Sequence, residues 1–438
     1  MKKVITYGTY DLLHHGHIAL LKRAKALGDY LIVGVTADDF DKARGKLNVQ
    51  QTLEERIAAV KGTGLADKII IEEYEGQKID DIKKYGVDIF TVGSDWEGFF
   101  DYLNEYCRVV YLPRTEGVSS SEIRARKTLR LGMVGYSSFL SKFYNEAGYV
   151  NTVDIAGICV PEKGILNDLK PKVQIYTDEY DELLDHVDAV YIHSHPNQHY
   201  EQCMKALEKG KSILCESPIA LSRKEYDTLK NEAQKRHCVM MEAIRTAFII
   251  AYRRMLLLLK SGKIGDVVSV DATCTSLTTD ENSDPEKRWG AMKTWGSTAL
   301  LPVLQVFGTN YKDLKFFSLY DRTFPSIDTF TKISLSYDHC TATIKTGTGV
   351  KSEGDLIVSG TKGYIYVPSP WWKTDYFEVR FENPSENKRY FYQLEGEGIR
   401  HELIAFSRAV AEKQPNDDID QSVTESIVTI MDAFQTKK

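Results

Sequence analysis

The sequence predicts an α/β protein built from three domains, and three observations support this. A chain of 438 residues usually forms two or three domains. Strand and helix patterns alternate through the first third, and the alternation restarts at about Lys127. From residue 266 onward, short strands with alternating apolar residues dominate. We therefore expect domains at 1–128, 129–245 and 246–438, the first two with parallel sheets and the third with an α+β fold.

The first domain is expected to contain a parallel sheet covered on both faces, because its strands are almost continuously apolar. Ligands on such sheets bind beyond the carboxyl ends of the strands. Three segments fall there, namely Gly8–Asp11, Gly93–Trp96 and Arg114–Ser121. The predicted strands cover residues 4–8, 30–36, 68–73, 87–93 and 108–113, and the predicted helices cover 17–28, 52–62, 78–86, 99–106 and 119–127.

The second domain shows the same pattern, with apolar strands predicted at 129–135, 153–160, 188–194 and 211–217 and helical stretches between them. The third domain is expected to hold a mostly antiparallel sheet and two closing helices. Its predicted strands are 266–276, 315–321, 329–337, 341–347, 355–360, 363–369 and 376–382, and its closing helices are 401–413 and 422–435.

Composition predicts a soluble, cytoplasmic protein. Hydrophobic residues make up 42% and charged residues 27% of the chain, as in ordinary globular proteins. A net charge of −6 argues against nucleic acid as a partner, because phosphate binding requires an excess of Lys and Arg. The apolar run at 255–260 is too short to span a membrane, and the first residues do not resemble a signal peptide. The 7 cysteines are scattered without a CxxC pair, which favours free thiols in a reducing compartment.

Residues 8–17, GTYDLLHHGH, hold three of the 10 histidines in the chain. His14 and His17 are three residues apart at a predicted helix start, so they share one face. Gly16 leaves room for a ligand to approach, and the N–H groups of a helix N-terminus suit phosphate. The alternative is structural, with His17 capping the helix and His14 packing under a loop. The position directly after a strand and a tight turn favours phosphate binding.

Three motifs carry a family resemblance: GTYDLLHHGH, GSDWEGFFD at 93–101 and RTEGVSSS at 114–121. Together they resemble the cytidylyltransferase family, and within it the bacterial glycerol-3-phosphate branch. The likeness covers nearly all of residues 1–127 and implies a Rossmann-like, parallel-sheet nucleotidyltransferase domain. The implied reaction joins CTP to a polyol phosphate such as glycerol 3-phosphate and releases pyrophosphate. CDP-glycerol, the implied product, feeds teichoic acid and capsule polymers.

The resemblance also implies roles for individual residues. A phosphate oxygen of the acceptor attacks the α-phosphorus of CTP, so the site must align two phosphates and neutralise charge. Lys46 and Arg56 are placed over the triphosphate and acceptor, or alternatively lie on a solvated face; Trp96 frames the cytidine or belongs to the core. Mg²⁺ is the expected cofactor, with Asp11 as a candidate contact and no complete ligand set assigned. The predicted catalytic residues are His14, His17, Lys46 and Arg114; the nucleotide-binding residues are Gly8, Thr9, Tyr10, Gly16, Gly93, Asp95, Trp96, Arg114, Thr115, Ser119 and Ser120; the substrate-binding residues are Asp11, Asp38 and Arg56.

Residues 129–438 resemble the glucose–fructose oxidoreductase and inositol dehydrogenase family. The motifs are DAVYIHSHPNQHYE at 188–201, ILCESPIALS at 213–222, SGKIGDV at 261–267 and SGTKGYIYVPSPWW at 359–372. This resemblance implies a Rossmann-like domain for NAD(P) followed by an α+β open-sheet domain. Because the open sheet of this family commonly serves as an oligomer surface, we expect a homodimer.

Three departures from that family's pattern make NAD(P) chemistry doubtful. The G-x-G-x-x-G fingerprint keeps only Gly135 in the run 135–140, and the second strand ends at Cys159, Val160 and Pro161, where no acidic residue stands to bind an adenosine ribose. Ser217 stands where the family has a lysine. Thr294 and Thr298 stand at the proton-transfer positions, and His195, Pro196, Asn197 and His199 are compatible with a structural role.

Three hypotheses for the protein therefore remain. In the first, residues 129–438 form a non-catalytic module for structure or oligomerisation. In the second, they reduce a keto sugar phosphate with NAD(P)H before cytidylyl transfer. In the third, disfavoured by the intact HxGH and RTxGxS motifs, the whole protein only senses nucleotides.

Overall fold

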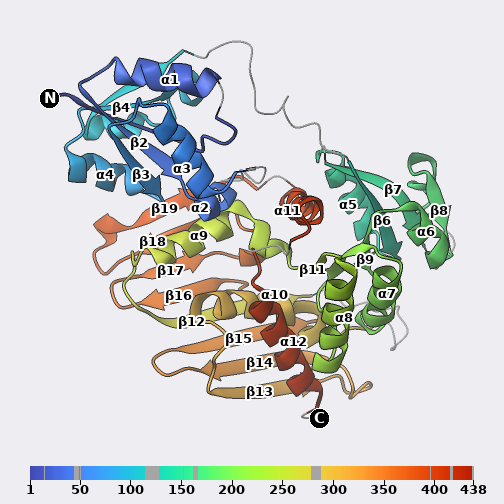
Figure 1. The fold of residues 1–438 in the computed structure, drawn as a ribbon. Coiled ribbons are helices and arrows are strands. Elements are labelled where there is room, and N and C mark those ends of the chain that lie inside the picture. The colour runs from blue at the N-terminus through green and yellow to red at the C-terminus, as the bar shows by residue number, and fades with distance from the viewer. Residues whose placement is uncertain are drawn as a thin grey trace. The chain divides into compact units, whose positions relative to one another are not determined.

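The structure is a computed structural model that describes residues 1–13, 15–43, 49, 51–113, 128–150, 152–160, 166–277, 288–394, 396–414 and 418–436. His15, Lys42, Ala43 and Asp95 are described by their backbone alone. The chain divides into two compact units, Met1–Arg126 and Lys127–Lys438 (Figure 1). Within the described ranges, no helix is long and apolar enough to cross a membrane. The seven cysteines all lie in the described ranges and are free thiols.

The first unit contains a five-stranded parallel sheet with the strand order β3-β2-β1-β4-β5. Successive residues of β1 face opposite sides, with Val4 in one apolar cluster and Ile5 in the other. The predicted parallel sheet with apolar residues on both faces is therefore confirmed. The strands are β1 (Lys3–Gly8), β2 (Tyr30–Thr36), β3 (Lys68–Glu72), β4 (Ile89–Gly93) and β5 (Arg108–Leu112), and the helices are α1 (His15–Lys25), α2 (Asp38–Ala43), α3 (Leu53–Gly62) and α4 (Gln77–Tyr85).

Local sequence explains where several of these elements begin. Thr52 caps α3 by accepting a hydrogen bond from the Glu55 N–H, and the Glu55 carboxylate returns one to the Thr52 N–H. The helix predicted over 99–106 forms only a 3₁₀ turn, η2 (Asp101–Glu105), after another, η1 (Ser94–Trp96). This segment is rich in aromatic residues, which favour helices weakly. The helix predicted at 119–127 lies outside the described residues.

The second unit begins with a six-stranded parallel sheet in the order β11-β10-β9-β6-β7-β8. The prediction of a second Rossmann-like domain is therefore confirmed. The strands are β6 (Leu129–Gly135), β7 (Val153–Cys159), β8 (Ile175–Thr177), β9 (Ala189–His193), β10 (Ser212–Glu216) and β11 (Met240–Ala243). The helices are α5 (Phe139–Ala147), α6 (Tyr180–His186), α7 (Pro196–Glu208) and α8 (Arg223–Arg236), with the 3₁₀ turns η3 (Lys170–Lys172) and η4 (Arg245–Phe248).

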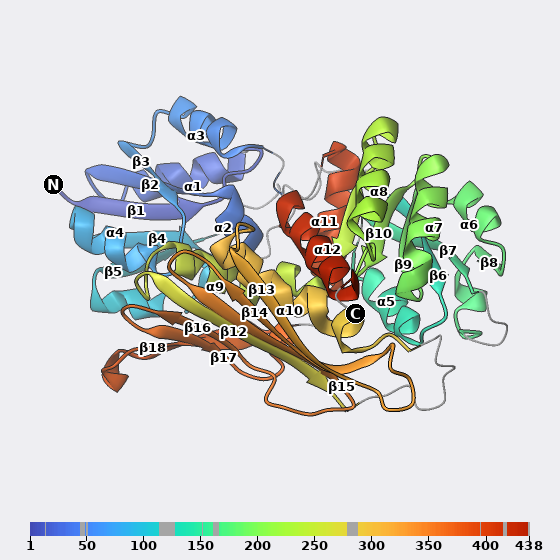
Figure 2. The ribbon, with the colours of Figure 1, turned by 90° about the horizontal axis from the view of Figure 1, so that it is seen from below.

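An eight-stranded sheet completes the second unit, and every strand pair in it is antiparallel except β12–β15. Helix α10 lies along one face of this sheet (Figure 2). The strands are β12 (Val267–Ser276), β13 (Asp313–Tyr320), β14 (Asp328–Ser336), β15 (Thr341–Thr348), β16 (Leu356–Gly360), β17 (Tyr364–Val367), β18 (Tyr376–Arg380) and β19 (Lys388–Phe391). The helices are α9 (Ile250–Lys260), α10 (Ala291–Phe307), α11 (Ile399–Glu412) and α12 (Gln421–Thr436), and the 3₁₀ turns are η6 (Trp371–Lys373) and η7 (Pro384–Glu386).

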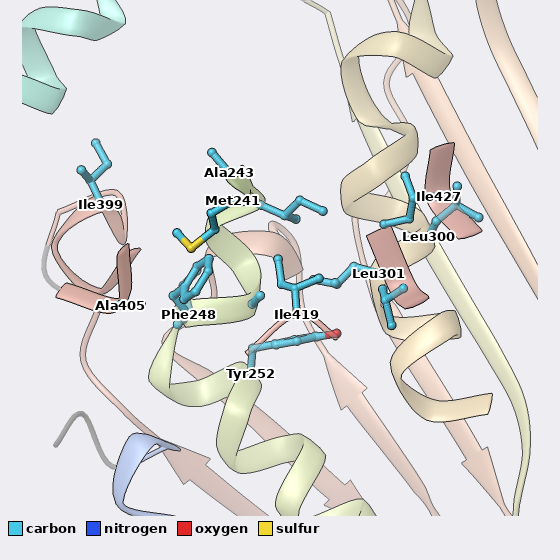
Figure 3. Packing of buried hydrophobic residues seen from close by; sticks show 14 of the residues in the cluster. Met241, Ala243, Phe248, Tyr252, Leu300, Leu301, Ile399, Ala405, Ile419 and Ile427 are labelled. Carbon is cyan, nitrogen blue, oxygen red and sulfur yellow. The ribbon is translucent and has the colours of Figure 1, made fainter. Parts of the chain in front are cut away.

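One continuous apolar core joins the two sheets of the second unit. Figure 3 shows Met241 and Phe248 near the edge of the parallel sheet, with Ile419, Tyr252 and Leu301 extending the cluster toward α10. The C-terminal helices also return to the Rossmann-like part, with α11 against α5 and α12 against α8. Because burial of this shared surface stabilises both parts, they form one compact unit.

Candidate active site

The first unit has a topological switch point between β1 and β4. From β1 the chain proceeds outward to β2 and β3 on one side, whereas β4 and β5 lie on the other side. The Gly8–Asp11 turn follows β1, and the Gly93–Trp96 turn follows its neighbour β4. Ligands of open parallel sheets bind in the crevice at such a point. The structure thus places two of the three predicted segments at the carboxyl ends of two neighbouring strands.

The turn between β1 and α1 is tightly packed. Tyr10 is buried with a φ of 55°, and burial raises the pKa of its phenol above the ordinary value. A Cβ added to Gly8 would lie 3.0 Å from the Tyr10 ring, so a side chain here would have to displace that ring by a few tenths of an ångström. The His17 ring meets the Tyr10 ring edge to face, with the centroids 5.6 Å apart. Tyr10 therefore supports one of the two predicted catalytic histidines.

Arg56 is fully buried, which excludes the alternative of a solvated face. Its Nη1 donates to the carbonyl oxygens of Thr9 at 2.7 Å and Thr36 at 2.8 Å. The same guanidinium pairs with Asp38 and lies 3.4 Å from Asp41, which is also fully buried. It thereby joins the ends of β1 and β2 to α2. These partners occupy several of its donors, so Arg56 acts at least as a positioning residue for the β1–α1 turn.

Sequence patterns did not identify Gln51 or Asp41 as parts of the site. Gln51 receives a hydrogen bond from the Leu12 N–H at 2.7 Å on its side-chain oxygen and donates its own N–H to Asp11 Oδ1 at 3.0 Å. The Thr9 hydroxyl donates to Asp41 Oδ1 at 2.7 Å. These bonds fix the turn that carries the predicted phosphate-binding groups. No local motif signals them, because they connect residues about 30 to 40 positions apart.

Trp96 is 37% exposed and packs against Phe99 and Phe100, with ring centroids 5.4 and 5.9 Å away. It is therefore a partly accessible aromatic surface at the carboxyl end of β4, not a core residue. Gly93 has open space where a side chain would stand. Several predicted site residues lie outside the described residues: His14, Lys46, Arg114, Thr115, Ser119 and Ser120.

The second unit has its own switch point, between β6 and β9, where a dinucleotide would bind. Gly135 ends β6, and a Cβ there would lie 2.1 Å from the His193 carbonyl oxygen. The Phe139 ring stacks on the His193 ring at 5.1 Å, and the Arg245 guanidinium lies 4.5 Å from the centroid of Phe139. The side chains of Phe139, His193 and Arg245 therefore pack together at the carboxyl end of the second parallel sheet.

The amide groups at the start of α5 already have partners. The Phe139 N–H donates to the Ser137 hydroxyl at 3.2 Å, and the Leu140 N–H donates to the Ser137 carbonyl at 3.1 Å. Leu140 is fully buried in the core. In a dinucleotide site, glycines at this turn expose the helix N–H groups to the pyrophosphate.

Two residues at the positions where the oxidoreductase family has its catalytic groups donate hydrogen bonds to backbone carbonyls. The Ser217 hydroxyl donates to the Ala243 carbonyl at 3.1 Å, and the Thr294 hydroxyl donates to the Gly290 carbonyl at 2.7 Å. His199 is buried between the carbonyls of Pro218 and Ser194, and burial lowers its pKa. His195 accepts the Asn197 N–H as the cap of α7. The structural role predicted for these two histidines agrees with these contacts.

Comparison with known proteins assigns both units. Residues 5–126 match the cytidylyltransferase-like family, and residues 129–244 match the oxidoreductase family with an NAD-binding Rossmann fold. The glycerol-3-phosphate cytidylyltransferase of Bacillus spizizenii is 50% identical over 124 residues, which is 28% of this chain and 95% of that protein. The enzyme of the same name from Staphylococcus aureus is 49% identical over 124 residues, 28% of this chain and 93% of the relative.

Solved structures resemble the second unit at low identity. A 3-ketoreductase from Actinomadura kijaniata, in complex with TDP-benzene and NADP, matches 71% of this chain and 98% of its own with a TM-score of 0.63 and 18% identity. An aldose-aldose oxidoreductase from Caulobacter crescentus matches 71% and 98% with a TM-score of 0.62 and 15% identity. These matches establish the fold. The chain belongs to the cytidylyltransferase family, as a nucleotidyltransferase whose N-terminal domain is fused to a module with an oxidoreductase fold.

Proposed function

We propose that the protein transfers the cytidylyl group of CTP to glycerol 3-phosphate, forming CDP-glycerol and pyrophosphate. The observation that carries this proposal is the switch point between β1 and β4, where the Gly8–Asp11 turn and the Gly93–Trp96 turn follow two neighbouring strands. The two relatives at 50% and 49% identity bear the name of this activity. The product would supply enzymes that build glycerol-phosphate polymers such as teichoic acids or capsules.

In this reaction a phosphate oxygen of the acceptor forms a bond to the α-phosphorus of CTP. The bond between the α-phosphorus and the oxygen that bridges it to the β-phosphate breaks, and pyrophosphate leaves. His17, at the start of α1, donates a hydrogen bond to the phosphates as negative charge develops, together with His14. Trp96 offers an aromatic face for the cytosine. Arg56 and Gln51 keep the β1–α1 turn in position.

Mg²⁺ is proposed to accompany the CTP phosphates, where it would neutralise charge on the leaving pyrophosphate. Among the described residues, no group of three His, Cys, Asp or Glu side chains could hold a metal ion. Mg²⁺ often takes only one or two carboxylates from the protein, with phosphates and water as its other ligands. Asp11, in the turn after β1, is the carboxylate we assign to it.

Acceptor choice can be tested by pyrophosphate release with CTP and a series of phosphorylated alcohols. We expect kcat/KM to be higher for glycerol 3-phosphate than for ribitol 5-phosphate or ethanolamine phosphate, because the relatives at 50% and 49% identity bear the name of the glycerol-3-phosphate enzyme. Unphosphorylated glycerol is the control and should give no turnover. A higher kcat/KM with either other phosphate would change the substrate assignment.

We propose further that the second unit binds no dinucleotide and reduces no substrate. Three observations support this: the Phe139 ring packed against both His193 and Arg245, the α5 amides bonded to Ser137, and Leu140 in the core. These residues do not fit an extended pyrophosphate. The loss of a lysine at Ser217 and the engaged Thr294 hydroxyl support the same view.

On this proposal the second unit has a structural role. Phe317 and Leu319 are 62% and 66% exposed, whereas the neighbouring Phe316 packs against Phe434 of α12. They place two exposed apolar side chains on the opposite face of the open sheet. We propose this face as the surface of a homodimer, because exposed apolar patches often mark association sites.

Titration of NADH and NADPH against protein fluorescence tests the proposed loss of cofactor binding. We expect no saturable change at micromolar cofactor, because the protein's own side chains occupy the sheet end. CTP added to the same preparation serves as the control for active protein. Micromolar affinity for either cofactor would restore the bifunctional hypothesis.

A further inference from the structure

A cavity of about 560 Å³ lies at the outer edge of the second parallel sheet. Strand β11 borders it and is the edge strand of that sheet, separated from the β6–β9 switch point by β10. One face of α8 lines the cavity through Tyr226, Lys230, Ala233 and Gln234, which are spaced as on one side of a helix, and His237 follows directly after its end. The cavity is therefore distinct from the place where the oxidoreductase fold holds its cofactor.

The inner wall of the cavity is apolar. Met241, Phe248 and Ile419 line it, and Figure 3 shows these three side chains grouped beside the edge strand. All three belong to the buried core. An apolar molecule entering here would extend that core, and burial of its surface would favour binding by about 25 cal/mol per Å².

Two polar groups stand in this apolar wall. The Glu242 carboxyl is 3% exposed; its Oε1 accepts hydrogen bonds from Ile219 N–H and the Ser297 hydroxyl, both at 3.3 Å, while its Oε2 has no partner among the described residues. Burial raises the pKa of Glu242 to about 7, so the group can donate or accept a hydrogen bond near neutral pH. Tyr226 is also buried against the cavity. A buried oxygen without a partner is costly, and a ligand atom would relieve that cost.

Two lysines line the cavity, and one of them has no acidic partner among the described residues. Lys230 and Lys413 both line it, and Lys230 pairs with Glu425 at 2.6 Å. Lys413 is exposed and has no ion pair within the described part of the chain. An anionic group at the mouth would meet this ammonium group without losing an existing partner.

We propose that this cavity is a binding site for a small amphiphilic anion, with an apolar ring body inside, a hydrogen-bonding group at Glu242 and a negative group at Lys413. Such a site would give the second unit a ligand-sensing role that is independent of cytidylyl transfer and of NAD(P).

The probe for this test is 1-anilinonaphthalene-8-sulfonate, which combines an aromatic body, one N–H and one sulfonate. Its fluorescence is titrated against the full chain and three variants. Lys413→Glu should weaken binding about tenfold, because it reverses the charge at the mouth. Lys224→Glu, an exposed change on α8 away from the cavity, should leave the affinity unchanged. Ala233→Phe should abolish binding by filling the cavity from α8.

Thermal unfolding of each variant shows whether the second unit is folded, and Lys413→Glu keeps the test valid if Ala233→Phe does not fold. Equal affinity of Lys413→Glu and the unmodified protein would overturn the proposal, as would the absence of any saturable binding. Displacement of the probe by CTP would place it at the transferase site and would equally contradict the proposed cavity.

Discussion

Replacement of His17 by alanine is expected to lower kcat for pyrophosphate release about 10²- to 10³-fold, as the loss of one preorganised hydrogen-bond donor to a transition state typically does. His17 stands in the first turn of α1, directly after the β1 turn, with its ring against buried Tyr10. That packing orients the ring before the nucleotide arrives. The ground-state affinity for CTP should change less than kcat, because the donor matters most as charge develops.

The measurement is steady-state pyrophosphate release, with thermal unfolding to show that the fold is retained. His186→Ala is the matched control, since His186 is an exposed histidine at the end of α6 in the second unit. A nearly unchanged kcat in His17→Ala would show that this histidine only supports the turn.

Replacement of Arg56 by methionine is expected to destabilise the first unit by about 3–5 kcal/mol, the usual cost of removing one partner from a buried ion pair. Asp41 is fully buried and would lose its cation, and the carbonyls of Thr9, Thr36 and Gln51 would lose a donor. Asp38 is about half exposed and adds little to this cost, because solvent screens its charge.

Urea unfolding of the first unit measures the effect of Arg56→Met. Lys25→Met, which removes a partly exposed partner of Asp67, is the control and should cost at most about 1 kcal/mol. If both variants lose similar stability, the buried network does not hold the turn. The fraction of Arg56→Met that is folded should also show reduced kcat/KM, because the same contacts hold Thr9 and the β1–α1 turn in position.

Hydrophobic patterning was sufficient to predict both parallel sheets. Strands such as β2 and β9 are apolar at almost every position, and such strands are typical of a parallel sheet that is covered on both faces. The patterning also placed Gly8–Asp11 and Gly93–Trp96 at strand ends, where the structure has them. Patterning could not show the burial of Arg56, since a charged residue in an amphipathic helix ordinarily faces solvent. Its burial depends on Asp41 and on two strand-end carbonyls, contacts that form only when distant segments meet.

The second unit illustrates the same limit. Missing glycines in residues 135–140 predicted a poor dinucleotide site, yet nothing in the sequence predicted that Phe139 would pack against His193 and Arg245. The cavity beside β11 could not be predicted from the sequence either, because residues far apart in the chain line it: those of α8, those of an edge strand, and Lys413, Gln414 and Ile419. Such features depend on tertiary packing and leave no periodic signal.

The most direct test of the proposed division of labour is one pyrophosphate-release assay with two substrate mixtures. CTP with glycerol 3-phosphate should release pyrophosphate at the same rate with or without NADPH, because the first unit performs the transfer alone. CTP with dihydroxyacetone phosphate and NADPH should release none, because no glycerol phosphate is made. Pyrophosphate release that requires NADPH in the second mixture would contradict a non-catalytic second unit, and no release in either mixture would contradict glycerol-3-phosphate cytidylyl transfer itself.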